Sequence, residues 1–152
     1  MRWRVGFSFE ITDMYGVKKG AKKASISFGN IVDSGVTNEN GAVYNLTQGW
    51  ASNTDLGAFN PSALASALND GHDSFRFYIF NPNADDVTFY VMENNTWIKT
   101  DIVTLKANTW TEVVLDSSIV QANKNNLFYM CVSSGAGTSG WQISDMYSFW
   151  AD

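Results

Sequence analysis

The sequence predicts an all-β fold, an antiparallel β-sandwich of jelly-roll type that contains one short helix around residues 61–69. Several segments alternate apolar and polar residues with the period of a half-buried strand, as residues 5–11 do. Turn sequences rich in Gly, Asn, Asp and Ser separate these segments at short intervals. Many short strands spaced by turns are typical of sandwiches and jelly rolls.

Eight or nine segments are expected to be strands. Residues 75–80 are apolar on both faces, which is typical of a central strand that is covered on both sides. Residues 81–86 have a turn composition, so the strands on either side of them are expected to form a hairpin. The expected strands cover residues 5–11, 24–28, 41–46, 75–80, 87–92, 97–100, 111–115, 127–132 and 141–150.

One segment has the signals of a helix. Asn60 suits the N-cap position, and Pro61 suits the first helical position, where its missing N–H costs nothing. Leu64 and Leu68 lie four residues apart and therefore share one face, and an Asp-Gly pair ends the segment. A second, weaker helical turn is expected at residues 117–122.

The composition suits a single domain over residues 1–152 and excludes several classes of protein. Aromatic residues make up 14% of the chain, far more than a disordered protein contains. The formal net charge is −5, which argues against a nucleic-acid partner, and no apolar run is long enough for insertion into a membrane. Cys131 is the only cysteine, which excludes an internal disulfide framework.

The composition also indicates where the chain works. It is acidic, poor in charged residues and rich in Asn, Ser and Thr, as many extracellular β domains are. The first residues do not form a secretory signal, because residues 5–10 offer no apolar stretch of sufficient length. We therefore expect a domain excised from a larger secreted multidomain protein, located outside the cell or on its surface.

Catalytic motifs are weak. Residues 135–140 match the GxGxxG pattern, but an alternating aromatic segment follows instead of the required helix, so a flexible loop is expected. His72 is the only histidine and is expected in a surface turn, and no GxSxG elbow is present. We expect no enzyme, although a pair of carboxylates facing a cleft remains an alternative, since such a pair need only be close in space.

Several tryptophans occur at turns rather than within alternating strands. Trp50 precedes a polar loop, Trp97 follows an Asn-Asn-Thr turn, and Trp141 follows the Gly/Ser loop. An exposed indole offers a flat apolar face and one N–H donor, a combination that suits the C–H faces and hydroxyls of sugars. The alternative is that these side chains fill the core of the sandwich.

A second candidate surface for sugar is a sheet face. Alternate residues of the two expected central strands supply Arg76, Tyr78, Thr88 and Tyr90, and Tyr44 belongs to the same candidate set. Arg76 stands out because it lies between two phenylalanines, and it either binds ligand or pairs with a carboxylate on a solvated face. The sequence leaves the choice between this face and the tryptophan loops open.

Four segments together resemble a known family. They are residues 9–27, 78–82, 105–116 and 143–146. The chain resembles carbohydrate-binding modules with a galactose-binding-like β-sandwich, which are attached to bacterial polysaccharide-degrading and cell-surface proteins. The resemblance implies a structural calcium ion held by Glu10 of the first strand and Asp145 of the last. The family often has two adjacent aspartates there, whereas this chain has Ser144 in the first position.

These observations predict a non-catalytic carbohydrate-binding module that binds a polysaccharide or glycan through exposed aromatic residues. Its expected partners are that glycan and the other domains of its parent protein, with no nucleic acid and no membrane insertion. The alternative function is a structural or protein-interaction sandwich domain of a cell-surface, adhesin or phage protein, in which the aromatics lie in the core or an interface.

Overall fold

A computed structural model of the chain describes residues 21–23, 31–46, 55–58, 61–93, 97–123, 128–133 and 140–150. This part is built mainly of antiparallel strands, which confirms the all-β prediction. The elements are β1 (Lys22–Lys23), β2 (Ile31–Asn38), β3 (Gly41–Leu46), β4 (Asp55–Ala58), α1 (Pro61–Asn69), β5 (Ser74–Asn81), β6 (Val87–Glu93), β7 (Lys99–Leu105), β8 (Thr109–Leu115), α2 (Ser117–Asn123), β9 (Phe128–Val132), β10 (Gln142–Ser144) and β11 (Tyr147–Phe149).

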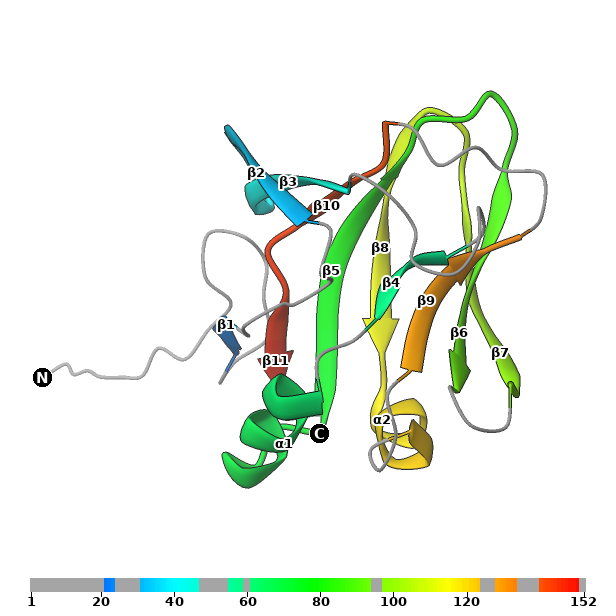
Figure 1. The fold of residues 1–152 in the computed structure, drawn as a ribbon. Coiled ribbons are helices and arrows are strands. Elements are labelled where there is room, and N and C mark those ends of the chain that lie inside the picture. Colours follow the sequence, from blue (N-terminus) through cyan, green and yellow to red (C-terminus); the bar gives the residue numbers. More distant parts are fainter. Residues whose placement is uncertain are drawn as a thin grey trace, which may run out of the picture.

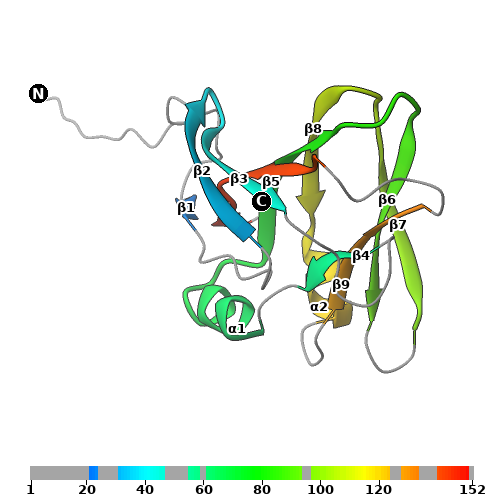
Figure 2. The same cartoon turned by 45° about the horizontal axis from the view of Figure 1, so that its top comes forward.

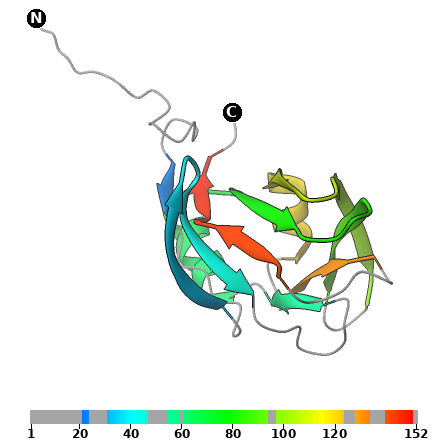
Figure 3. The same ribbon diagram turned by 90° about the horizontal axis from the view of Figure 1, so that it is seen from above.

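The strands form two sheets (Figure 1). The larger sheet has the order β1-β11-β5-β10-β3-β2, and β8 pairs with β5. The smaller sheet has the order β4-β9-β6-β7. Seen from above, the red β10 lies between the cyan β3 and the green β5, and the orange β9 belongs to the other layer (Figure 3). Figure 2 separates the layers, with β2 and β3 on one side of the molecule and β6 and β7 on the other.

The core lies between the two sheets. Alternate residues of β5 point into it, and Phe75, Phe77 and Ile79 are almost completely buried. Phe89 and Val91 of β6 meet them from the smaller sheet. The rings of Phe77 and Phe89 are 6.1 Å apart and steeply tilted at 72°, the edge-to-face arrangement that aromatic pairs favour.

Both helices cover the same end of the sandwich (Figure 1). Helix α1 covers Pro61–Asn69, as predicted, and buries Leu64 against the core, while Gly71 ends it in a left-handed conformation with a φ of 86°. Helix α2 begins after Asp116, whose carboxylate accepts the backbone N–H of Ile119 as an N-cap. None of the helices in the described ranges is long and apolar enough to span a membrane.

Two predictions about strand pairing are wrong. The expected hairpin of residues 75–80 and 87–92 does not form, because β5 and β6 belong to different sheets. The expected strand 141–150 is broken into β10 and β11, which pair in succession with the same edge of β5. The predicted strands 5–11 and 24–28 lie outside the described residues.

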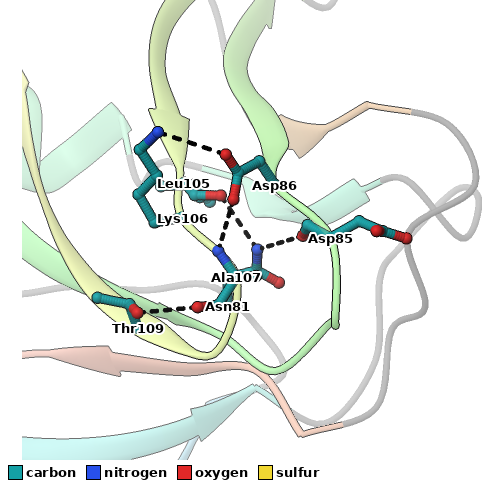
Figure 4. A network of polar contacts seen from close by, with 7 residues as sticks. All are labelled: Asn81, Asp85, Asp86, Leu105, Lys106, Ala107 and Thr109. Carbon is teal, nitrogen blue, oxygen red and sulfur yellow. Dashed lines mark hydrogen bonds and ion pairs between the residues drawn. The ribbon is translucent and has the colours of Figure 1, made fainter.

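The crossing from β5 to β6 is held by a polar network at the end of the sandwich opposite the helices (Figure 4). Asn81 is fully buried, and its amide nitrogen donates to the carbonyl oxygens of Asp85 and Leu105. Asp86 accepts the N–H of Ala107 at 2.9 Å and pairs with Lys106 at 3.4 Å. These contacts tie the turn between β5 and β6 to the turn between β7 and β8.

Candidate functional site

The outer face of β5 carries the residues that alternate with its core residues. Arg76, Tyr78 and Phe80 are all half-buried there. Residues directly opposite one another in an antiparallel pair share a face of the sheet. We call the resulting surface the β5–β8 face; its β8 residues, opposite Arg76, Tyr78 and Phe80 respectively, are Val114, Glu112 and Trp110.

Arg76 organises one half of this face. Its Nε donates to the Glu112 carboxylate, and its Nη2 donates to the hydroxyl oxygen of Tyr78. The guanidinium carbon also lies 4.8 Å from the centre of the Tyr78 ring, within the range of a cation–π contact. The Arg76 side chain is only 11% exposed, whereas that of Glu112 is 45% exposed. Glu112 is therefore the charged group that this face presents to solvent.

An aromatic pair forms the other half of the face. The rings of Phe80 and Trp110 have centroids 5.7 Å apart and are tilted by 50°. Gln142 of β10 lies beside Phe80, and its Nε2 donates to Oδ1 of Asn45 in β3 at 2.8 Å. Two adjoining aromatic rings are thus continued across the sheet by two side-chain amides.

The structure brings only part of the predicted sheet-face set together. Arg76 and Tyr78 are in contact on the β5–β8 face. Tyr44 lies on the opposite face of the same sheet, because it pairs with the core residue Ile143. Tyr90 is only 9% exposed and clusters with Tyr129 on the smaller sheet, so the prediction of an exposed Tyr90 beside Arg76 is wrong.

The three predicted tryptophans do not form one site. Trp141 is 0% exposed and belongs to the core, which corrects the expectation of an exposed ring. Trp97 is 58% exposed, but it follows the end of β6, at the opposite end of the sandwich from the Asn81 network. Trp50 lies outside the described residues.

The sequence did not identify five residues on or beside the β5–β8 face as sugar-binding: Trp110, Glu112, Phe80, Gln142 and Asn45. Alternation within residues 109–115 shows that the first two share a face. It does not show which strand lies beside them. The register with β5 supplies that information, and only the folded chain contains it.

Asp145 lies where the last strand breaks, between β10 and β11. It is buried, and its carboxylate accepts the N–H of Ala42 and the hydroxyl of Tyr44, both at 3.0 Å. The ammonium of Lys23 lies 3.1 Å from Oδ1. The hydrogen bond to Asp145 raises the pKa of Lys23, and burial followed by the bond to Asp145 raises the pKa of Tyr44.

Of the two residues that the resemblance assigns to calcium, only Asp145 lies among the described residues, and it is held by the partners just named. Calcium prefers six to eight oxygen ligands, whereas Asp145 faces an ammonium, and the described residues contain no group of three or more metal-ligating side chains. Glu10 lies outside the described residues, so calcium binding stays a prediction. The melting temperature of the chain, measured with added calcium chloride and with EDTA, tests this prediction.

Gly41 leaves open the space that the carboxylate of Asp145 occupies. Its φ is +105°, and a Cβ there would stand 2.8 Å from Oδ2 of Asp145. We expect Gly41→Ala to lower the melting temperature clearly, since it adds a clash to the cost of a left-handed backbone. Gly35→Ala is the matched control, because Gly35 has a φ of +76° with open space around its Cβ. Equal losses in the two variants, measured by thermal unfolding, would contradict the role given to Asp145.

His72 is not the surface residue that the sequence suggested. It is 4% exposed, and its Nδ1 lies 2.8 Å from Oγ of Ser148. The centres of its ring and of the Trp150 ring are 5.4 Å apart. Ser148 is itself buried. The pair therefore ties the loop after α1 to β11.

Comparison with protein families and with curated proteins finds no relative. No protein-family model matches the chain, and no curated protein matches it either. The geometry of the β5–β8 face is therefore the basis for assigning a function.

Proposed function

We propose that the chain is a non-catalytic module that binds a polysaccharide or glycan on the β5–β8 face. The observation that carries the proposal is the half-buried Phe80–Trp110 pair with the Gln142–Asn45 amides beside it. Aromatic rings stack on the apolar faces of sugars, while amides and carboxylates bind hydroxyls. An aromatic pair with polar side chains beside it is the combination that such a ligand requires.

The topology supports the jelly-roll form of the sandwich that the proposal assumes. Leaving out β1, β2 and β11, the larger sheet has the order β3-β10-β5-β8 and the smaller one β4-β9-β6-β7. The chain crosses between the two sheets at almost every connection, which is the behaviour of interleaved Greek keys. The proposed setting remains a larger secreted protein, outside the cell or on its surface.

The test uses affinity electrophoresis and calorimetry on a panel of plant, host and microbial polysaccharides. We expect Trp110→Ala to weaken binding by roughly 30-fold, because truncation of a tryptophan at the centre of an interface costs about 2 kcal/mol. Trp97→Ala is the control, since Trp97 is exposed at the other end of the sandwich. If no glycan binds the wild-type chain, or if both variants bind as it does, the proposal fails.

A specific observation also favours the alternative, a structural or protein-interaction sandwich. Val32 and Val36 of β2, the edge strand of the larger sheet, are 51% and 56% exposed. Exposed apolar side chains on one sheet suit a protein partner. Acrylamide quenching of tryptophan fluorescence distinguishes the two functions, since sugar shields Trp110 only if glycan is the ligand.

A further inference from the structure

We propose that the β5–β8 face selects an uncharged glycan and recognises its hydroxyl groups through Tyr78 as donor and Glu112 as acceptor. This inference rests on the proposed function and names the class of sugar that the face accepts. It excludes polyuronates and sulfated glycans, the anionic ligands that an exposed arginine would otherwise suggest.

Arg76 acts as an internal support of the face. A guanidinium that captures a ligand carboxylate presents two parallel N–H groups to it. Here Nε is bonded to Glu112 and Nη2 to Tyr78, and the side chain is 11% exposed. Its charge is thus neutralised by a residue of the same face and largely shielded from solvent.

The hydrogen bond from Arg76 also fixes the role of the Tyr78 hydroxyl. A phenol has one proton to donate and can accept at its oxygen. Since Arg76 donates to that oxygen, the phenol proton is left for another acceptor, and no group in the described part of the chain takes it. A ligand atom above Tyr78 must therefore be able to accept a hydrogen bond.

Glu112 places the opposite requirement on the ligand. It lies directly across from Tyr78 in the strand register and accepts from Arg76 at Oε2. A carboxylate offers about four acceptor sites, so Glu112 retains capacity for a donor. A sugar hydroxyl, or two neighbouring hydroxyls, can accept from Tyr78 and donate to Glu112. A carboxylate or sulfate cannot donate, and it would meet the negative charge of Glu112.

The other charges of the chain act in the same direction. The formal net charge is −5, and three described lysines are paired elsewhere, Lys22 with Asp70, Lys23 with Asp145 and Lys106 with Asp86. The fourth, Lys99, lies over the ring of Tyr90 on the smaller sheet. The other polar side chains beside the β5–β8 face, Gln142 and Asn45, are uncharged amides. A polyanion would find no compensating cation on the described part of this face other than Arg76, which is already paired.

Calorimetry with neutral polysaccharides, such as xylan and a β-glucan, and with polygalacturonate tests the inference at low and high salt. We expect a neutral polysaccharide to bind with an affinity that salt does not change, and polygalacturonate not to bind. Binding of polygalacturonate alone, weakened by salt, would overturn the inference while leaving glycan binding intact. No binding of any glycan would instead overturn the proposed function.

Two variants test the roles of the individual groups. Tyr78→Phe keeps the ring and removes the donor, so we expect affinity for the neutral glycan to fall about tenfold. Glu112→Gln keeps the size of the side chain and removes its charge, so we expect weaker neutral binding and the appearance of polygalacturonate binding. Thr104→Val, at an exposed position of β7 in the smaller sheet, is the control and is expected to bind as the wild type does. Unchanged affinity in Tyr78→Phe and Glu112→Gln would contradict the inference.

Discussion

Asp145→Ala is expected to lower the free energy of unfolding by about 2–4 kcal/mol, because two half-buried donors lose their acceptor at about 1–2 kcal/mol each. The donors are the N–H of Ala42 and the hydroxyl of Tyr44, both 3.0 Å from the carboxylate. The exposed ammonium of Lys23 adds little, since solvent screens such pairs. Urea unfolding followed by tryptophan fluorescence measures the loss.

Asp145→Asn is the matched control for this prediction. The amide keeps the shape of the side chain and one acceptor oxygen, but it loses the charge and one acceptor. We expect Asp145→Asn to lower the free energy of unfolding less than Asp145→Ala does. The remaining loss arises from weaker contacts at the junction of β10 and β11. An alanine variant as stable as the wild type would show that the carboxylate does not hold this junction.

The same cluster predicts how stability changes at high pH. The folded-state pKa values of Lys23 and Tyr44 are both raised, so both groups bind their protons more tightly in the folded chain. Their contribution to stability is complete below the unfolded pKa values of about 10 and is lost as pH rises through the folded values. The wild-type chain should therefore lose stability above about pH 10. Asp145→Ala should lose less over this range.

Local patterns predicted local structure well. The strand expected at residues 41–46 and the helix expected at residues 61–69 have the same bounds in the folded chain. Alternation and capping depend only on neighbours in sequence, which explains why these predictions are confirmed. Strand β2 was missed because Gly35 and a change of register between Asp33 and Val36 interrupt its alternation.

The sequence did not predict which residues meet on one face of a sheet, because this depends on pairing between distant strands. Arg76 and Tyr78 share a face by alternation alone, but Tyr90 was grouped with them through a hairpin that does not exist. Trp110 lies beside Phe80 only because β8, rather than β6, pairs with β5. Register is set by the packing of whole sheets, so residues that are local in sequence carry little information about it.

Asn81 is the second position at which we expect a large effect. It is 0% exposed and stands where the chain leaves β5 and crosses to the smaller sheet. Its amide nitrogen donates to Asp85 and Leu105, and its Oδ1 accepts the backbone N–H of Asn83 at 2.9 Å. Both polar atoms of this buried side chain therefore have partners in the turns that it joins, and Figure 4 shows the two contacts of the amide nitrogen.

Asn81→Ala is expected to cost about 2–4 kcal/mol in unfolding free energy, because backbone groups at the crossing lose their partners. Asn81→Asp should cost at least as much, since it turns a negative oxygen toward the carbonyls that now accept from the amide.

The network also adjoins the aromatic pair. Phe80 directly precedes Asn81, and Trp110 directly follows Thr109, the residue that pairs with Asn81. Glycan affinity should therefore fall in Asn81→Ala at temperatures where the variant is still folded. Guanidinium unfolding and calorimetry separate the two effects. Unchanged stability would show that the network does not hold the crossing, and lost stability with full affinity would show that it does not position the aromatic pair.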